Sequence, residues 1–113
     1  ALAAGASVGA RACSGDPNGT AEIIAKAIRH PGFAFIEILS PCVTFRPEQR
    51  EWKNHVHAAS VDTTDDAARA ARRIMTDDGF NLGVLYAGQR KAYAAPRHPA
   101  PRSVAELARE FEL

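Results

Sequence analysis

The chain is short of cysteine, aromatic residues and long hydrophobic runs, and each shortage excludes a class of protein. Two cysteines in 113 residues, Cys13 and Cys42, are too few for a disulfide framework, so a reducing cytoplasm is the expected compartment. A single bridge between them stays open on these grounds. No apolar run approaches the ~20 residues that span a bilayer, and the small apolar start lacks the positive charges of a signal peptide, so no membrane association is expected.

The composition is that of an ordinary globular chain. Lys and Arg number 14 against 13 Asp and Glu, so the net charge of +1 gives no reason to expect nucleic acid as a partner. A hydrophobic fraction of 46% over 113 residues suits one hydrophobic core. Walker, GxGxxG, GxSxG and HExxH motifs are all missing, so no familiar catalytic motif points to an activity.

The first 45 residues alternate strand and helix patterns in the way that is typical of an open α/β sheet. Residues 1–5 look like the end of a helix closed by glycine, which suggests a piece of a longer chain. Residues 6–13 are small and fit a buried strand, and Asp16 followed by Pro17 predicts the start of a helix. The β-prone run over residues 33–40 predicts a strand covered on both faces of a parallel sheet.

The second half has a different character. Residues 46–60 are polar, so we expect an ordered excursion rather than a core element. Thr63 and Asp66 fit a capping box at the start of the helix that follows. The remaining expected elements are that helix over residues 63–75, a strand over residues 80–88, a Pro-rich linker over residues 95–102 and a C-terminal helix capped by Ser103.

Cys42 is the most informative side chain, because it follows a strand instead of lying inside one. Beyond Pro41 it is either a small buried hydrophobe or a functional thiol, and spacing alone favours the buried role. The functional alternative rests on position, since ligands of open α/β sheets bind just beyond the carboxyl ends of strands. One cysteine cannot hold a zinc ion or an iron–sulfur cluster alone, because these need about four ligands. Cys13 has no CxxC partner and is interpreted as structural.

The other chemistry-bearing groups have plain interpretations. His55 and His57 would share one face of a strand and could ligate a metal or exchange protons. Their polar segment contains no further His or Cys, which favours surface histidines. Helix-end electrostatics accounts for the acidic pair at residues 65–66, and turn formation accounts for the pair at residues 77–78.

Five short elements occur in order within the first 45 residues: ALAAGA (1–6), AR (10–11), SGD (14–16), HPGF (30–33) and SPCVTF (40–45). Together they resemble the β subunit of 2-oxoacid:ferredoxin oxidoreductases, of the 2-oxoglutarate or pyruvate type, which depend on thiamine diphosphate. The element SPCVTF after HPGFA is the most specific of them. The rest of the chain resembles that subunit only loosely, as its variable C-terminal part.

The resemblance implies a fold and a set of cofactors. Residues 1–45 would be the end of a thiamine-diphosphate-binding α/β domain of the pyrophosphate type, and residues 46–113 would be a C-terminal extension. Thiamine diphosphate and magnesium would be held by an upstream GDG…N motif that this sequence does not contain. A 4Fe–4S cluster would take three upstream cysteines and, as its fourth ligand, the cysteine of the PCVTF element, which is Cys42. With the resemblance, the metal-ligand role replaces the structural role as the expectation for Cys42.

The resemblance also implies an activity. The whole enzyme oxidatively decarboxylates a 2-oxoacid to acyl-CoA and CO2, and electrons leave through the cluster to ferredoxin; its partners are an α subunit, ferredoxin, the 2-oxoacid and coenzyme A. This chain alone is expected to be inactive, since most ligands lie outside it. Many relatives have Asn where this chain has Arg46, and a cation near a cluster would favour the reduced state. Two alternatives remain: a non-catalytic α/β module that binds a partner subunit, and a thiol-dependent protein with Cys42 as nucleophile.

Overall fold

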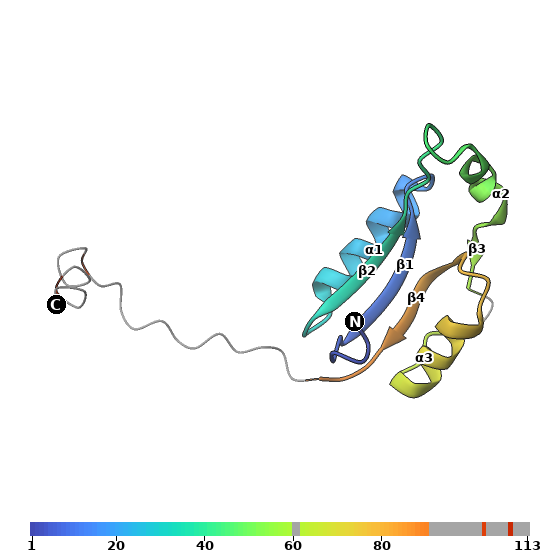
Figure 1. Cartoon of the computed structure of the whole chain (residues 1–113). Coiled ribbons are helices and arrows are strands. Elements are labelled where there is room, and N and C mark those ends of the chain that lie inside the picture. Colours follow the sequence, from blue (N-terminus) through green and yellow to red (C-terminus); the bar gives the residue numbers. More distant parts are fainter. Residues whose placement is uncertain (60–61, 91–102, 104–108, 110–113) are drawn as a thin grey trace.

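The computed structural model describes residues 1–59, 62–90, 103 and 109, so the predicted linker lies outside the described residues, as does the predicted C-terminal helix apart from Ser103 and Arg109. The described part is a small α/β domain with a mixed sheet in the strand order β2-β1-β4-β3 (Figure 1). The coarse α/β prediction is therefore confirmed. The strands are β1 (Val8–Cys13), β2 (Ala34–Leu39), β3 (His57–Ala58) and β4 (Asn81–Ala87).

β1 is the central strand, and its small residues explain its burial. It pairs in parallel with β2 along six residues and antiparallel with β4 on its other side. Every residue of β1 is buried. Ala10 and Ala12 leave room for Ile23 of the first helix, and Ile36 and Val84 pack against the same cluster. The predicted buried strand is confirmed for residues 8–13, and residues 6 and 7 are buried but precede it.

The helix α1 (Pro17–Arg29) begins where the sequence predicts. The Asp16 carboxylate accepts a hydrogen bond of 3.0 Å from the backbone N–H of Gly19, and Pro17 occupies the first turn, where its missing N–H costs nothing. α1 buries Ile23 and Ala27 against the sheet. It covers one face of β1 and β2 (Figure 1).

β2 corrects a prediction, because it is not covered on both faces. Within the described residues it pairs with β1 alone and forms the edge of the sheet. Phe35 is 47% exposed and Ile38 is 45% exposed. The two residues lie on opposite faces. Phe35 lies on the face away from α1, where it lines a pocket, and Ile38 lies on the same face as Ile36, where α1 leaves the edge of the sheet partly open. A near-continuous apolar run predicted burial that the described residues do not provide.

The polar excursion after β2 is ordered, as predicted. It contains a 3-10 turn, η1 (Pro47–Glu51), and a short helix, α2 (Trp52–His55). Trp52 lies edge-on to Phe80 with ring centroids 5.8 Å apart, and the ring of His55 lies 5.5 Å from the same phenyl ring. These contacts anchor the excursion next to the start of β4.

The helix α3 (Ala67–Thr76) starts later than predicted, and the capping box is wrong. Asp66 is itself the N-cap, since its carboxylate accepts from the backbone N–H groups of Ala68 and Arg69. The Thr63 hydroxyl instead donates to the carbonyl of Val84 at 2.7 Å. Thr63 therefore ties the loop before α3 to β4 and does not cap the helix.

The sheet crosses the predicted boundary at residue 45. β4 comes from the second segment and pairs with β1 of the first, so one sheet contains strands from both. The division into residues 1–45 and 46–113 stays a prediction. At the start of the chain, Gly5 has φ +96° and donates to Leu2, while Ala6 donates to Ala1, which is the hydrogen-bond pair of a glycine-closed helix end. No helix in the described part of the chain is long and apolar enough to cross a bilayer.

Candidate functional site

Cys42 lies in a turn that hydrogen bonds hold in shape. The turn follows β2, and Cys42 is exposed to solvent. Its backbone N–H donates to Gln49 Oε1 at 2.8 Å, and its carbonyl accepts from the backbone N–H of Arg46 at 2.8 Å. Gln49 belongs to η1, so the turn and the 3-10 segment support each other. The result is an accessible thiol on a defined backbone.

Cys13 ends the neighbouring strand in an opposite environment. It stands opposite Leu39 of β2 in the parallel register, and it is only 3% exposed. Its carbonyl accepts from the Thr20 hydroxyl at 2.9 Å, which joins the strand end to α1. Both cysteines are free thiols, so the bridge between Cys13 and Cys42 that the sequence left open is not present.

The described residues do not by themselves fit a metal cluster. Among them, no three His, Cys, Asp or Glu side chains come together as a metal site. Cys42 offers a single thiol, whereas a 4Fe–4S cluster takes about four ligands. Any cluster at Cys42 therefore needs ligands from outside the described part of this chain.

Arg46, the residue that departs from the resemblance, has its charge offset locally. Its guanidinium forms an ion pair with Glu48, and this hydrogen bond lowers the pKa of the Glu48 carboxyl below its ordinary value. Both side chains are exposed, so solvent screens the pair. The expected influence of Arg46 on a nearby redox group is therefore smaller than its charge alone suggests.

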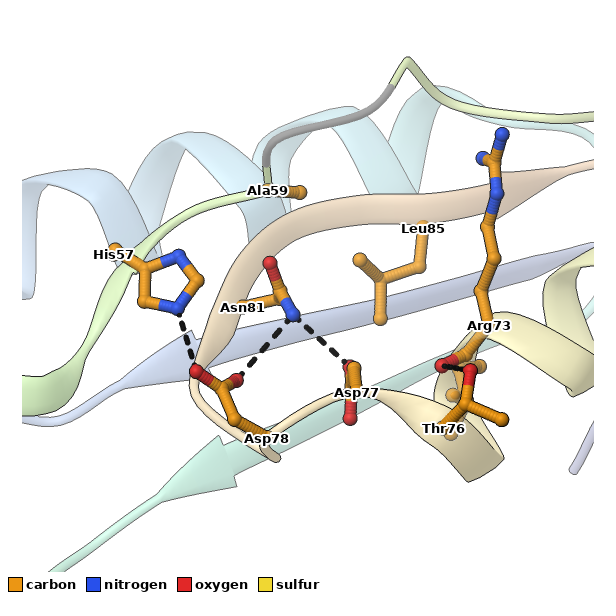
Figure 2. A pocket seen from close by; sticks show the side chains of 9 residues that line it. His57, Ala59, Arg73, Thr76, Asp77, Asp78, Asn81 and Leu85 are labelled. Atoms are coloured by element: carbon orange, nitrogen blue, oxygen red, sulfur yellow. Dashed lines mark hydrogen bonds and ion pairs between the residues drawn. The ribbon is translucent and has the colours of Figure 1, made fainter.

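A second polar site lies between β3, β4 and the end of α3, around a pocket of about 400 Å3 (Figure 2). His57 Nε2 is 2.9 Å from Asp78 Oδ2. The Asn81 amide donates to the carboxylates of both Asp77, at 3.3 Å, and Asp78, at 3.4 Å. Asp77 and Asp78 also accept from backbone N–H groups of the turn they begin, as predicted for that acidic pair.

The His57–Asp78 pair shifts both titrations. The hydrogen bond to Asp78 raises the pKa of His57, and the same bond lowers the pKa of Asp78. His55 does not share a face with His57 in a strand, because it ends α2 and its Nδ1 lies 2.8 Å from the Glu51 carbonyl oxygen. The interpretation as surface histidines is supported by the exposure of both residues.

Arg11 continues this polar network under the sheet. Its guanidinium is buried and donates to Glu37 of β2 at 2.7 Å and to Asp77 at 3.1 Å. Burial lowers the pKa of Arg11, but the two carboxylates outweigh it and raise the pKa above its ordinary value, so Arg11 stays charged. Hydrogen bonds thus link residues of all four described strands: Glu37, Arg11, Asp77, Asn81, Asp78 and His57.

This network has the character of structural support. Each carboxylate oxygen of Asp77 and Asp78 already accepts from a group of this chain, so little acceptor capacity faces the pocket. Sequence reasoning assigned the acidic pair to a turn and missed its link to Arg11. The available signal was a single arginine inside an otherwise small-residue strand and a single glutamate inside the next strand.

Comparison with known proteins adds no relative. No family model matches the chain, and neither the curated proteins nor the solved structures contain a match.

Proposed function

We propose that this chain is the C-terminal part of the β subunit of a 2-oxoacid:ferredoxin oxidoreductase, and that Cys42 is one of four thiolate ligands of its 4Fe–4S cluster. The observation that carries the proposal is an exposed thiol, held in a hydrogen-bonded turn just beyond a parallel strand. Thiolates are the ligands that such clusters require. The element SPCVTF, which resembles the family's cluster element, forms this turn.

The residues around Cys42 have definite tasks under this proposal. Pro41 follows the strand and turns the chain away from the sheet. The Cys42 backbone N–H donates to the side-chain amide oxygen of Gln49. This N–H group therefore does not point to a cofactor. Val43 and Phe45 are 42% and 84% exposed, and they would limit access of water to the thiol once a partner segment covers them. The bound cluster would supply single-electron transfer toward ferredoxin.

The remaining ligands and reactants come from outside the chain under the same proposal. Thiamine diphosphate and magnesium would be held by the upstream GDG…N motif, and no residue here is assigned to them. The α subunit, ferredoxin, the 2-oxoacid and coenzyme A would be the partners of the whole enzyme. A cytoplasmic location suits free thiols.

Purification of the native assembly tests the proposal. An affinity tag on this chain, expressed in its own cells and purified without oxygen, should recover iron, acid-labile sulfide and the EPR signal of a reduced four-iron cluster. Cys42→Ala should abolish this signal or convert it to that of a three-iron cluster. Cys13→Ala, the matched control, should keep it. A full four-iron signal in Cys42→Ala, or a native assembly without iron, would overturn the proposal.

One observation favours a second candidate, a non-catalytic module that binds a partner subunit. Phe33 and Ile38 expose apolar surface at the free edge of β2, and such edges readily pair with another chain. The reading frame upstream of Ala1 separates the two candidates. A CxxC pair and a GDG…N motif there favour the oxidoreductase, and a start codon directly before Ala1 favours the module.

The third candidate, a thiol nucleophile, lacks support from the contacts of Cys42. The Cys42 backbone N–H donates to the Gln49 side chain and the Cys42 carbonyl accepts from the Arg46 backbone N–H, and neither partner is a general base for the thiol. Full retention of activity after alkylation of Cys42 would dismiss this candidate.

A further inference from the structure

The pocket between β3, β4 and the end of α3 combines polar and apolar walls. Its volume of about 400 Å3 lies within the range of small-molecule sites in proteins. Ala59, Ile74 and Leu85 supply its apolar wall. In the view of Figure 2, Leu85 lies between the Asn81 amide and the long Arg73 side chain. The pocket therefore offers apolar surface beside a positively charged group.

Arg73 lines this pocket with a charge that no described carboxylate offsets. Its Nη1 donates to the backbone carbonyl of Asp62 at 2.8 Å, and none of the ion pairs of the described residues includes its guanidinium. The carboxylates of Asp77 and Asp78, in contrast, each have a cationic partner. Arg73 is half-buried, and a guanidinium carries five N–H donors, of which Asp62 takes one. Arg73 can therefore donate to an anion in the pocket.

The two carboxylates of the same pocket limit which anion fits. The oxygens of Asp77 and Asp78 already accept hydrogen bonds from groups of this chain, so they offer little to a ligand and keep their negative charge. A phosphate or a dicarboxylate would bring a second negative charge toward them, and solvent screens such repulsion only weakly in a half-buried pocket. A monocarboxylate brings one charge, and its two oxygens match the fork of a guanidinium.

We propose that this pocket binds a small aliphatic monocarboxylate, whose carboxylate lies on the Arg73 guanidinium and whose apolar body lies against Ile74 and Leu85. The apolar wall gives the ligand its aliphatic character, and Arg73 gives it its charge. Arg73 acts as a binding residue, and no bond of the ligand breaks. This inference does not depend on the proposed oxidoreductase function, because it uses no residue of the Cys42 turn.

NMR titration of the full 113-residue chain with hexanoate tests the proposal. We expect saturable shifts of the Ile74 and Leu85 methyl resonances, with half-saturation on the order of 1–10 mM. Acetate lacks the apolar body, 1-hexanol lacks the charge, and inorganic phosphate lacks the body and carries more charge. Each of these three should bind at least ~tenfold more weakly than hexanoate. The absence of a saturable shift with hexanoate, or binding of any of the three within that factor of hexanoate, would overturn the proposal.

Two matched substitutions on α3 sharpen the test. Arg73→Gln should weaken hexanoate binding at least ~tenfold, because it removes the cation from the pocket. Arg72→Gln makes the same change of charge at an exposed neighbour outside the pocket, and should leave binding unchanged. Amide spectra show whether each variant is folded, and the comparison of the four probes on the wild-type chain decides even if Arg73→Gln unfolds. Hexanoate binding that survives Arg73→Gln, or that falls equally in both folded variants, contradicts the proposal.

Discussion

β1 and β2 run in parallel and pair along six residues, but all six residues of β1 are buried, whereas β2 has only half-buried and exposed positions. The difference follows from position in the sheet. β1 has a neighbour on each side and α1 on one face, while β2 is the edge strand of the described sheet. Small side chains therefore lie in the centre, and the large apolar side chains of β2 lie where a further segment can cover them.

The largest expected effect separates two isoleucines of α1. Ile23 is 9% exposed and packs on Ala10 and Ala12 of β1, so Ile23→Ala should lower the free energy of unfolding by about 3 kcal/mol. Ile28 is 78% exposed, so Ile28→Ala should change it by less than ~0.5 kcal/mol. Urea denaturation followed by circular dichroism measures both values. Equal losses in the two variants would show that the edge side of α1 is as well packed as its centre.

The thiols of Cys13, at the end of β1, and Cys42, beyond the end of β2, should differ strongly in reactivity. The difference corresponds to a free energy comparable to the effect of Ile23→Ala. Cys42 is exposed and Cys13 is 3% exposed. Labelling of Cys13 needs local opening of the central strand, so Cys42 should react with a maleimide on the order of a hundredfold faster. Mass spectrometry of digested, labelled protein assigns the site. In denaturant the two rates should converge, and similar rates in the native protein would contradict the burial of Cys13.

Much of the local structure could be predicted, because it depends on neighbouring residues. The adjacent residues Asp16 and Pro17 specify the start of α1. The β-prone run of residues 33–40 specifies a strand. The capping box failed at Thr63 because a tertiary partner, the Val84 carbonyl, competes for its hydroxyl. Local patterns could not show that competition.

The candidate site was predictable only in part, for a related reason. The break after β2 and the cysteine beyond it are visible in the sequence, but spacing alone favoured a buried Cys42, whereas the side chain is exposed. The side chain that fixes its backbone, Gln49, was not predictable, because the bond spans a turn and a 3-10 segment whose geometry no short pattern specifies. The same holds for Arg11 and Asp77, which are 66 residues apart.

The next prediction concerns Arg11 of the buried strand β1, which forms an ion pair with Glu37 of the edge strand β2. Arg11→Leu removes the guanidinium that pairs with Asp77 and Glu37 and leaves the half-buried Asp77 carboxylate without that partner. We expect a loss of about 2 kcal/mol in the free energy of unfolding. Glu37→Gln should cost less, because its side chain is 50% exposed and water replaces the lost bond. A larger loss in Glu37→Gln would mean that β2, and not the centre of the sheet, depends on this pair.

The smallest expected effect concerns the opposite edge, where His57 and Asp78 join β3 to the turn before β4. Because the folded pKa of His57 is raised, its contribution to stability is present below 6.5 and is lost as the pH rises through the raised value. Because the pKa of Asp78 is lowered, its contribution is present above 3.8 and is lost as the pH falls through the lowered value. The pair should therefore stabilise the fold most between these limits.

An NMR titration of the His57 ring should give a midpoint above 6.5 that falls toward 6.5 in Asp78→Asn. A wild-type midpoint at or below 6.5 would show that the pair does not form in solution. Since both side chains are about half exposed, the change in stability should be much smaller than that of Arg11→Leu, so the edge at β3 contributes less to the fold than the centre at β1.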